Sequence, residues 1–314
     1  MLNVALIGIG AHCCGNHAPA LQHFAQQHPD AVRLAAACDL DEARAKRACE
    51  EFGFEQAFTD IDAMFDAVDI HAVEAIVHIA DILPVGKQLF ARGIPSMIEK
   101  PLGRDLPEAR AIADAAQQSG APVMVSLNRR FDPAVRIALD WAAEHGPIRA
   151  LQGSQLRHNR TEDYYLWGTA LHLLDLMCHV AGPLSLRPSG TVLPACRGGH
   201  DRIAHLDGPN GLVASATILP CCGRLEERIR IVGDDYCVDC WTGSTHPWRV
   251  EGYRDGKLLL HEQCPPDEPV FLRNGAWGET EAFLRAVLDG KPLPGPTPHD
   301  ALVASEIAEG LRAM

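Results

Sequence analysis

The most constraining feature of the sequence is a short apolar run that breaks at two closely spaced glycines near the N-terminus. The run LNVALI covers residues 2–7, Gly8-Ile9-Gly10 follows it, and a helix-compatible stretch comes next. In such a strand–turn–helix the first glycine permits the turn, and the second lets a pyrophosphate approach the backbone at the positive end of the helix. The pattern predicts a dinucleotide site formed by the residues of this turn, namely Gly8, Ile9, Gly10, His12 and Cys13.

The third glycine of the usual pattern is absent, because Cys13 occupies its place and the next glycine is Gly15. We therefore expect either a thiol packed between helix and strand or a longer turn. A second apolar run, residues 32–38, ends in Asp39, where an acid would hydrogen-bond an adenosine ribose. An exposed carboxylate that caps the next helix is the alternative interpretation of Asp39. With Asp39 in the ribose position, NAD is the expected cofactor and NADP the alternative.

Composition limits the partners and the compartment. The 314 residues exceed one typical core, so two domains are expected. The 28 basic and 41 acidic residues give a formal charge of -13, which disfavours nucleic acid and membrane surfaces and favours a small-molecule partner. No apolar run approaches the ~20 residues of a membrane span, and no signal peptide is evident, so we expect a cytoplasmic protein. Eleven scattered cysteines indicate reduced thiols, with Cys237 and Cys240 structural, and no metal-ligand spacing is evident.

The order of expected elements predicts the fold. Residues 1–126 alternate strands and helices, which is typical of a doubly wound parallel sheet of the Rossmann type. Residues 127–314 contain longer strands separated by turn sequences, which indicates an α+β domain on a mostly antiparallel sheet. We expect the first to bind the dinucleotide and the second to bind substrate. A C-terminal helix could return to the first domain, and the open face of the second sheet predicts a homo-oligomer. The expected strands are 2–7, 32–38, 74–79, 95–98, 122–126, 148–156, 211–219 and 225–232; the expected helices are 16–28, 41–52, 61–67, 84–92, 106–118, 167–181, 278–289 and 299–313.

A lysine follows the apolar run 94–98, in the sequence Glu99-Lys100-Pro101. The carboxyl edge of a parallel sheet is where ligands bind, so Glu99 and Lys100 are expected in the cofactor crevice. There Lys100 would orient a hydroxyl oxygen. A solvated loop lysine is the alternative.

Several motifs together resemble the glucose–fructose oxidoreductase, inositol dehydrogenase and MocA (Gfo/Idh/MocA) family of NAD(P)-dependent oxidoreductases. The resemblance covers nearly the whole chain and implies hydride transfer between a nicotinamide and a sugar, cyclitol or related polyol. It also implies that Lys100 and His172 are catalytic and line one pocket. The motifs are Gly8-Ile9-Gly10, His17-Ala18-Pro19-Ala20-Leu21, Cys38-Asp39-Leu40-Asp41, Glu99-Lys100-Pro101, Asn128-Arg129-Arg130-Phe131 and His172-Leu173-Leu174-Asp175.

The chain departs from the family pattern before this histidine, where Gly168 replaces an acid four residues upstream. The histidine segment after the third strand is also missing, because residues 80–84 contain none. We expect His172 to accept the hydroxyl proton alone, with Asp175 bracing it from one helical turn away. Two alternatives remain open: an NAD-dependent glycosidase that oxidises its substrate transiently, and a non-catalytic nucleotide-binding sensor.

The remaining candidates are polar residues close to the catalytic motifs. Arg157 and Tyr164 precede the His172 helix and are predicted, with Asp175, to bind substrate. Asn128 and Arg129 follow the last parallel strand and are predicted to border the nicotinamide.

Overall fold

The computed structural model describes residues 1–188, 191–192 and 200–314 of the chain, which form two compact units. The first unit contains residues 1–127, 270–272 and 276–301, and the second contains residues 128–269, 273–275 and 302–314. In the part of the chain that is described, no helix combines the length and apolarity that crossing a membrane requires.

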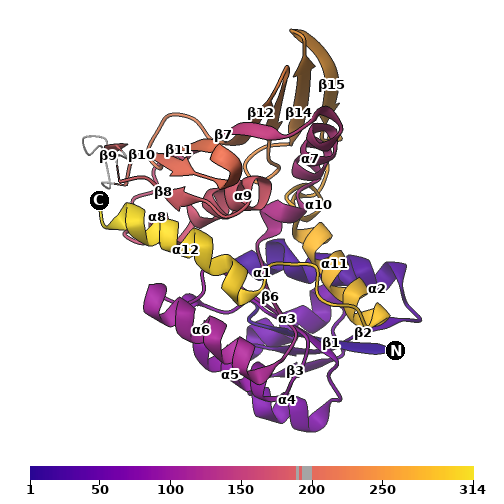
Figure 1. The fold of residues 1–314 in the computed structure, drawn as a ribbon. Helices are drawn as coiled ribbons and strands as arrows, with labels where there is room; N and C mark the ends of the chain where they lie inside the picture. Colours follow the sequence, from indigo (N-terminus) through magenta and orange to yellow (C-terminus); the bar gives the residue numbers. More distant parts are fainter. Residues whose placement is uncertain (189–190, 193–199) are drawn as a thin grey trace. The chain divides into compact units, whose positions relative to one another are not determined.

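The first unit is built on a parallel sheet of six strands in the order β3-β2-β1-β4-β5-β6. Figure 1 draws the strands and helices of residues 1–127 in indigo to magenta. The chain leaves β1 on one side toward β2 and β3 and resumes on the other side with β4. The sheet therefore has a topological switch point between β1 and β4, where doubly wound folds bind their ligands. The strands are β1 (Leu2–Ile7), β2 (Val32–Cys38), β3 (Gln56–Phe58), β4 (Ala72–Ala75), β5 (Ser96–Ile98) and β6 (Val123–Val125). The helices of this unit are α1 (Ala11–Gly15), α2 (His17–Gln27), α3 (Glu42–Phe52), α4 (Ile61–Ala67), α5 (Ile82–Ala91), α6 (Leu106–Ser119), α10 (Val270–Arg273) and α11 (Ala276–Asp289). The last helix, α12 (Pro298–Arg312), begins in the first unit and belongs to the second from residue 302 on.

The predicted doubly wound sheet is confirmed, with three local corrections. The helix expected at 16–28 is α2, and a short helix that was not expected, α1, precedes it, separated from it by the non-helical backbone of Asn16. The strand expected at 74–79 lies earlier, as β4. The edge strand β3 was not expected, since it has only three residues and none of them is buried.

Side-chain caps explain why several helices begin where predicted. The Asp105 carboxylate accepts the N–H of Glu108 at the start of α6, and Gly120 closes that helix with a φ of +68°. Asp41 caps α3 in the same way by accepting the N–H of Ala43. The cap of α3 is therefore Asp41 and not Asp39, for which capping was the alternative interpretation.

Gly8 fixes the path of the chain out of β1. Its φ is +86°, and a Cβ there would lie 2.4 Å from the carbonyl oxygen of Ile76. Any other residue would be strained and would collide with the backbone that follows β4. Gly8 therefore lets the turn pass directly over the switch point.

The second unit is built on a sheet in the order β15-β14-β13-β12-β7-β11-β10-β8, with β9 paired to β10. All neighbours are antiparallel except β7 and β11, which are parallel, so the predicted mostly antiparallel sheet is confirmed. The strands are β7 (Ile148–Leu156), β8 (Ser185–Leu186), β9 (Thr191–Val192), β10 (Arg202–Asp207), β11 (Val213–Leu219), β12 (Glu226–Gly233), β13 (Tyr236–Trp241), β14 (Arg249–Arg254) and β15 (Lys257–Gln263). Its helices are α7 (Pro133–His145), α8 (Tyr165–Gly168) and α9 (Leu171–Ala181), so the helix expected at 167–181 is two.

A glycine on β7 lets α9 lie close to the sheet. A Cβ at Gly153 would lie 2.4 Å from Sδ of Met177 and 3.0 Å from Cδ1 of Leu173, both on α9. The side chains of Met177 and Leu173 occupy this space and are fully buried. This contact fixes the helix that carries His172 on the central strand of the sheet.

Candidate cofactor and substrate site

The turn after β1 is tied to the end of β2 by a carboxylate. Oδ2 of Asp39 accepts the backbone N–H of Ile9 at 2.7 Å, and Oδ1 accepts the N–H of Asp41 at 2.9 Å. A Cβ at Gly10 would meet no atom within 4 Å among the described residues, so the face of the turn at Gly10 is open. Each Asp39 oxygen keeps a second lone pair that could accept a ribose hydroxyl. These features fit a dinucleotide.

Cys13 takes the place of the missing third glycine without exposing its thiol. The side chain is fully buried, and burial raises the pKa of the thiol well above its usual value. Cys13 lies within the short helix α1, which begins directly after Gly10, so the thiol is accommodated without a longer turn. Cys13 therefore packs as a small apolar side chain.

The Glu99-Lys100 pair lies where β5 leaves the sheet, as predicted from its position in sequence. Glu99 is buried, whereas Lys100 is half-buried. His12 of α1 is largely exposed, and its Nε2 lies 3.8 Å from Oε2 of Glu99. Three residues proposed for the cofactor site, His12, Glu99 and Lys100, are thus brought close to one another within the first unit.

A buried polar network that sequence reasoning missed lies at this edge of the sheet. Glu74 of β4 holds Nδ1 of His17 at 2.9 Å with one oxygen and accepts the hydroxyl of Thr280 at 2.9 Å with the other. Nε2 of His17 lies 3.9 Å from Glu99 and 4.0 Å from Glu279. A charged residue inside an apolar strand, Glu74, was the one signal in the sequence that could have revealed this network.

The network perturbs the acid–base behaviour of its members. Burial by itself would lower the pKa of His17, but the hydrogen bond and charge of Glu74 raise it to about 9. Burial raises the pKa of Glu279 to about 8, and His17 opposes that shift. The first unit therefore keeps one imidazole among three carboxylates, away from water.

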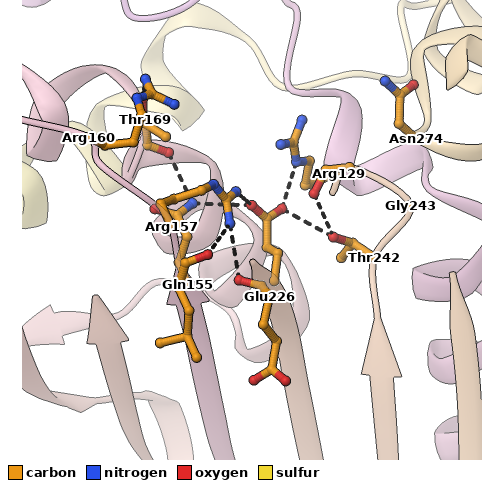
Figure 2. Close-up of polar contacts among 12 residues, drawn as sticks. Arg129, Gln155, Arg157, Arg160, Thr169, Glu226, Thr242, Gly243 and Asn274 are labelled. Atoms are coloured by element: carbon orange, nitrogen blue, oxygen red, sulfur yellow. Dashed lines mark hydrogen bonds and ion pairs between the residues drawn. The ribbon is translucent and has the colours of Figure 1, made fainter. Parts of the chain in front are cut away.

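In the second unit, two arginines converge on one buried carboxylate, Glu227. Its Oε1 accepts Nε of Arg129 at 2.7 Å, and its Oε2 is ion-paired with Nη2 of Arg157. Gln155 and Thr242 each donate to it at 3.2 Å. Figure 2 shows these side chains reaching the same point from separate strands and loops. Burial would raise the pKa of Glu227, but Arg129 and Arg157 hold it well below its usual range.

The Glu227 network also supports the start of the His172 helix. Nε2 of Gln155, which donates to Glu227, also donates to the carbonyl oxygen of Thr169 at 3.2 Å, and that oxygen accepts the N–H of His172 at 3.3 Å. Oε1 of Gln155 accepts the buried Tyr165 hydroxyl at 2.9 Å. The end of β7 therefore positions the first turn of α9, where His172 is buried.

Two other predicted site residues of the second unit, Asp175 and Asn128, form hydrogen bonds within the protein. Arg130 binds the buried Asp175 with two hydrogen bonds of 2.6 and 2.9 Å, so Asp175 is the partner of an arginine. Asn128 donates to the carbonyl oxygen of Asn274 at 2.9 Å and accepts from Arg129 at 2.9 Å.

Arg157 and Tyr164 differ in their availability to a ligand. The Arg157 guanidinium also donates to the carbonyl oxygens of Leu156 at 3.1 Å and Glu226 at 3.0 Å, so it is mostly satisfied within the protein. Tyr164 is 59% exposed, and a Cβ at Gly168 would lie 2.9 Å from its ring. Direct contact of Arg157, Tyr164 or Asp175 with substrate stays a prediction, as do the cofactor contacts of Asn128 and Arg129.

Comparison with known proteins agrees with this architecture. The model of the GFO_IDH_MocA family, described as an oxidoreductase family with an NAD-binding Rossmann fold, matches residues 2–127. A D-apiose dehydrogenase of Paraburkholderia graminis is 32% identical over 148 residues, which are 46% of this chain and 36% of that protein. An inositol 2-dehydrogenase of Corynebacterium glutamicum is 27% identical over 195 residues, which are 58% of this chain and 54% of that protein. The chain thus spans only about a third to a half of the length of these two relatives.

A solved structure extends the likeness to the whole chain. A dehydrogenase of Chromobacterium violaceum superimposes with a TM-score of 0.84 at 20% identity, over 100% of this chain and 95% of that one. At this identity the likeness establishes the fold alone.

Proposed function

We propose that the protein is an NAD(H)-dependent dehydrogenase or reductase of a sugar, cyclitol or related polyol, because residues 2–127 match the model of the Gfo/Idh/MocA family of oxidoreductases with an NAD-binding Rossmann fold. The observation that carries the proposal is the turn at Gly8 and Gly10 over the switch point, with Asp39 fixed beside it. The names of the relatives, D-apiose and inositol 2-dehydrogenase, support a CH–OH substrate.

Gly8, Gly10 and Asp39 would hold the dinucleotide, with Asp39 on the adenosine ribose. The bound nicotinamide would exchange a hydride with the substrate carbon. The chain must supply a group that takes the hydroxyl proton as the carbonyl forms, and a neutral imidazole does this near neutral pH. We assign the proton transfer to His172 and the orientation of the hydroxyl oxygen to Lys100.

The buried network of the second unit supports this role of His172. A general base must be held in a fixed geometry, because small displacements reduce the rate. Gln155, which also donates to Glu227, donates to the carbonyl oxygen of Thr169, and that oxygen accepts the backbone N–H of His172. In this proposal Arg157 has a positioning role, because it holds Glu227 in place, in addition to the predicted contact with substrate.

The proposal includes the assembly and location of the protein. We propose a homo-oligomer that pairs through the open face of the second sheet, which light scattering on the purified protein would test. The cysteines that the structure describes are free thiols, which supports a cytoplasmic location.

A panel of sugars, cyclitols and polyols with NAD and with NADP tests the proposal, with absorbance of the reduced nicotinamide as the readout. Reduction of added NAD by at least one polyol is expected. Cleavage of a glycoside without net reduction of NAD would instead indicate the NAD-dependent glycosidase. Binding of NAD without turnover of any substrate would indicate the sensor.

A further inference from the structure

Two imidazoles and one carboxylate of the first unit converge on a single point at the carboxyl edge of the parallel sheet. Oε2 of Glu99 lies 3.8 Å from Nε2 of His12 and 3.9 Å from Nε2 of His17. All three donor atoms lie within 4.8 Å of one another. We propose that His12, His17 and Glu99 form a binding site for a divalent metal ion of the zinc class, a proposal that does not rest on the dehydrogenase assignment.

The donor set and spacing suit such an ion. Zinc takes histidine nitrogens and carboxylate oxygens at ~2.0–2.2 Å in tetrahedral geometry, which places donors roughly 3.4 Å apart. The observed separations exceed this by a few tenths of an ångström for the two pairs that include Glu99. Three protein ligands leave a fourth position open, as in zinc sites that bind water or a substrate.

Glu99 provides the first independent sign of a ligand. The Glu99 side chain is 12% exposed, and its buried Oε2 accepts no hydrogen bond from the residues that the structure describes. A buried carboxylate oxygen without a hydrogen bond is costly. It faces the Nε2 atoms of both histidines, so a cation between them would satisfy it.

Glu74 provides the second sign, because it orients one of the ligands. Histidines that bind metals usually give their other ring N–H to a carboxylate, which fixes the tautomer and leaves the remaining nitrogen for the ion. Nδ1 of His17 lies 2.9 Å from Oε2 of Glu74, so Nε2 is the nitrogen presented to Glu99. Glu74 in turn accepts the Thr280 hydroxyl at 2.9 Å.

Charge in the network favours a divalent cation. Around Nε2 of His17 lie the carboxylates of Glu99 at 3.9 Å and Glu279 at 4.0 Å, and Glu74 binds the other ring nitrogen. These acids are buried together. A divalent ion at Nε2 would replace a ring proton there as the positive partner of Glu99 and Glu279.

Sequence reasoning missed the site for a geometric reason. His12 and His17 belong to different helices, α1 and α2, and Glu99 follows β5 more than eighty positions later in the chain. No local spacing motif joins them, so the absence of such spacing did not exclude a metal.

The test uses the full chain, freed of metal by dialysis against a chelator, and titrated with Zn²⁺ alone by calorimetry and with Co²⁺ alone by absorption spectroscopy. We expect one site per chain, with the visible bands of Co²⁺ bound to nitrogen and oxygen and without thiolate charge-transfer bands. His12→Ala and Glu99→Gln should each weaken binding by roughly tenfold or more. Glu74→Gln should weaken it by about 10–100-fold, as expected for a residue that orients a ligand.

His299→Ala is the matched control. His299 is also a partly exposed histidine of the first unit beside a carboxylate, with 3.9 Å between its Nε2 and Asp114, but it lies outside the three-residue cluster. Its variant should bind metal as the parent does. Because the side chain of His12 is 54% exposed, His12→Ala should fold normally, which circular dichroism would check. No stoichiometric binding, or equal binding by the parent, His12→Ala and Glu99→Gln, would overturn the proposal and leave His17 as an imidazolium held by carboxylates.

Discussion

The carboxylate of Asp39 accepts the backbone N–H of Ile9 at 2.7 Å, which joins the end of β2 to the glycine turn after β1. The same side chain that would select the ribose also shapes the turn beneath the pyrophosphate. Under the proposed role of Asp39, a substitution there would change both the cofactor preference and the hydrogen bond that holds the turn.

Asp39→Ser should relax the preference for NAD over NADP, because it removes the charge that repels a 2′-phosphate. Asp39→Asn is the matched variant, since an amide oxygen can still accept the N–H of Ile9 while the charge is lost. Titration of both cofactors by fluorescence would measure the ratio of dissociation constants. Tighter binding of NADP than NAD by the parent protein would contradict the assignment of Asp39.

His172→Ala should lower kcat by about 10²–10⁴-fold, the usual contribution of a general base. Cofactor affinity should stay nearly unchanged. His179→Ala is the control on the same helix, since the His179 side chain is exposed and lies seven positions further along α9. Equal kinetic effects of the two variants would argue that His172 has only a structural role.

Glu227→Gln should destabilise the protein strongly, because it leaves the guanidiniums of Arg129 and Arg157 buried without a counter-ion. Removing one partner of a buried ion pair costs about 3–5 kcal/mol of unfolding free energy, which urea denaturation would measure. Glu226→Gln removes a neighbouring carboxylate that pairs with the exposed Arg224 at 3.0 Å. This control variant should lower the free energy of unfolding by less than about 1 kcal/mol.

The ion pair also gives stability a pH dependence with a definite sign. Arg129 and Arg157 hold the pKa of Glu227 well below its usual value, against burial. The pair therefore stabilises the fold fully above the unfolded-state pKa of about 4.3 and loses this contribution as the pH falls below it. Glu227→Gln should show a weaker loss of stability in acid than the parent.

Asp132 should give the stability of the fold the opposite dependence on pH. Burial raises its pKa to about 7, although Gly243 and Ala134 donate backbone N–H groups to it at 2.8 and 2.9 Å. The folded state then keeps a proton that the unfolded chain releases near pH 4, so this residue makes the fold less stable as the pH rises from 4 to 7. Asp132→Asn should remove that slope in urea denaturation between pH 4 and 7; parallel curves of stability against pH for parent and variant would contradict it.

The sequence predicted those parts of the fold that local signals determine. The apolar runs placed β1 and β2, and the expected helix 106–118 matches α6, which Asp105 caps and Gly120 closes. The strand β3 was missed because pairing with β2, rather than its own residues, makes it a strand.

The candidate site was predictable only where a motif is continuous in sequence. The glycine turn, Asp39 and Lys100 each follow a strand directly, so the topology of a parallel sheet places them at one edge. Partners of Glu227 come from separate elements, with 98 positions between it and Arg129. No periodicity encodes such a contact, and the network became visible only in three dimensions.

Gly168→Asp tests the departure from the family pattern. A Cβ at Gly168 would lie 2.9 Å from Cδ2 of Tyr164, so the glycine leaves room for that ring beside the start of the His172 helix. We expect Gly168→Asp to lower kcat/KM on the best polyol, because the new side chain displaces Tyr164, and Gly168→Ala to lower it as well by the same steric cause. Tyr164 is 59% exposed and can move aside, so both variants should keep their fold and their affinity for NAD. A large gain in turnover for Gly168→Asp, with Gly168→Ala unchanged, would instead mean that the native site lacks an acid it needs.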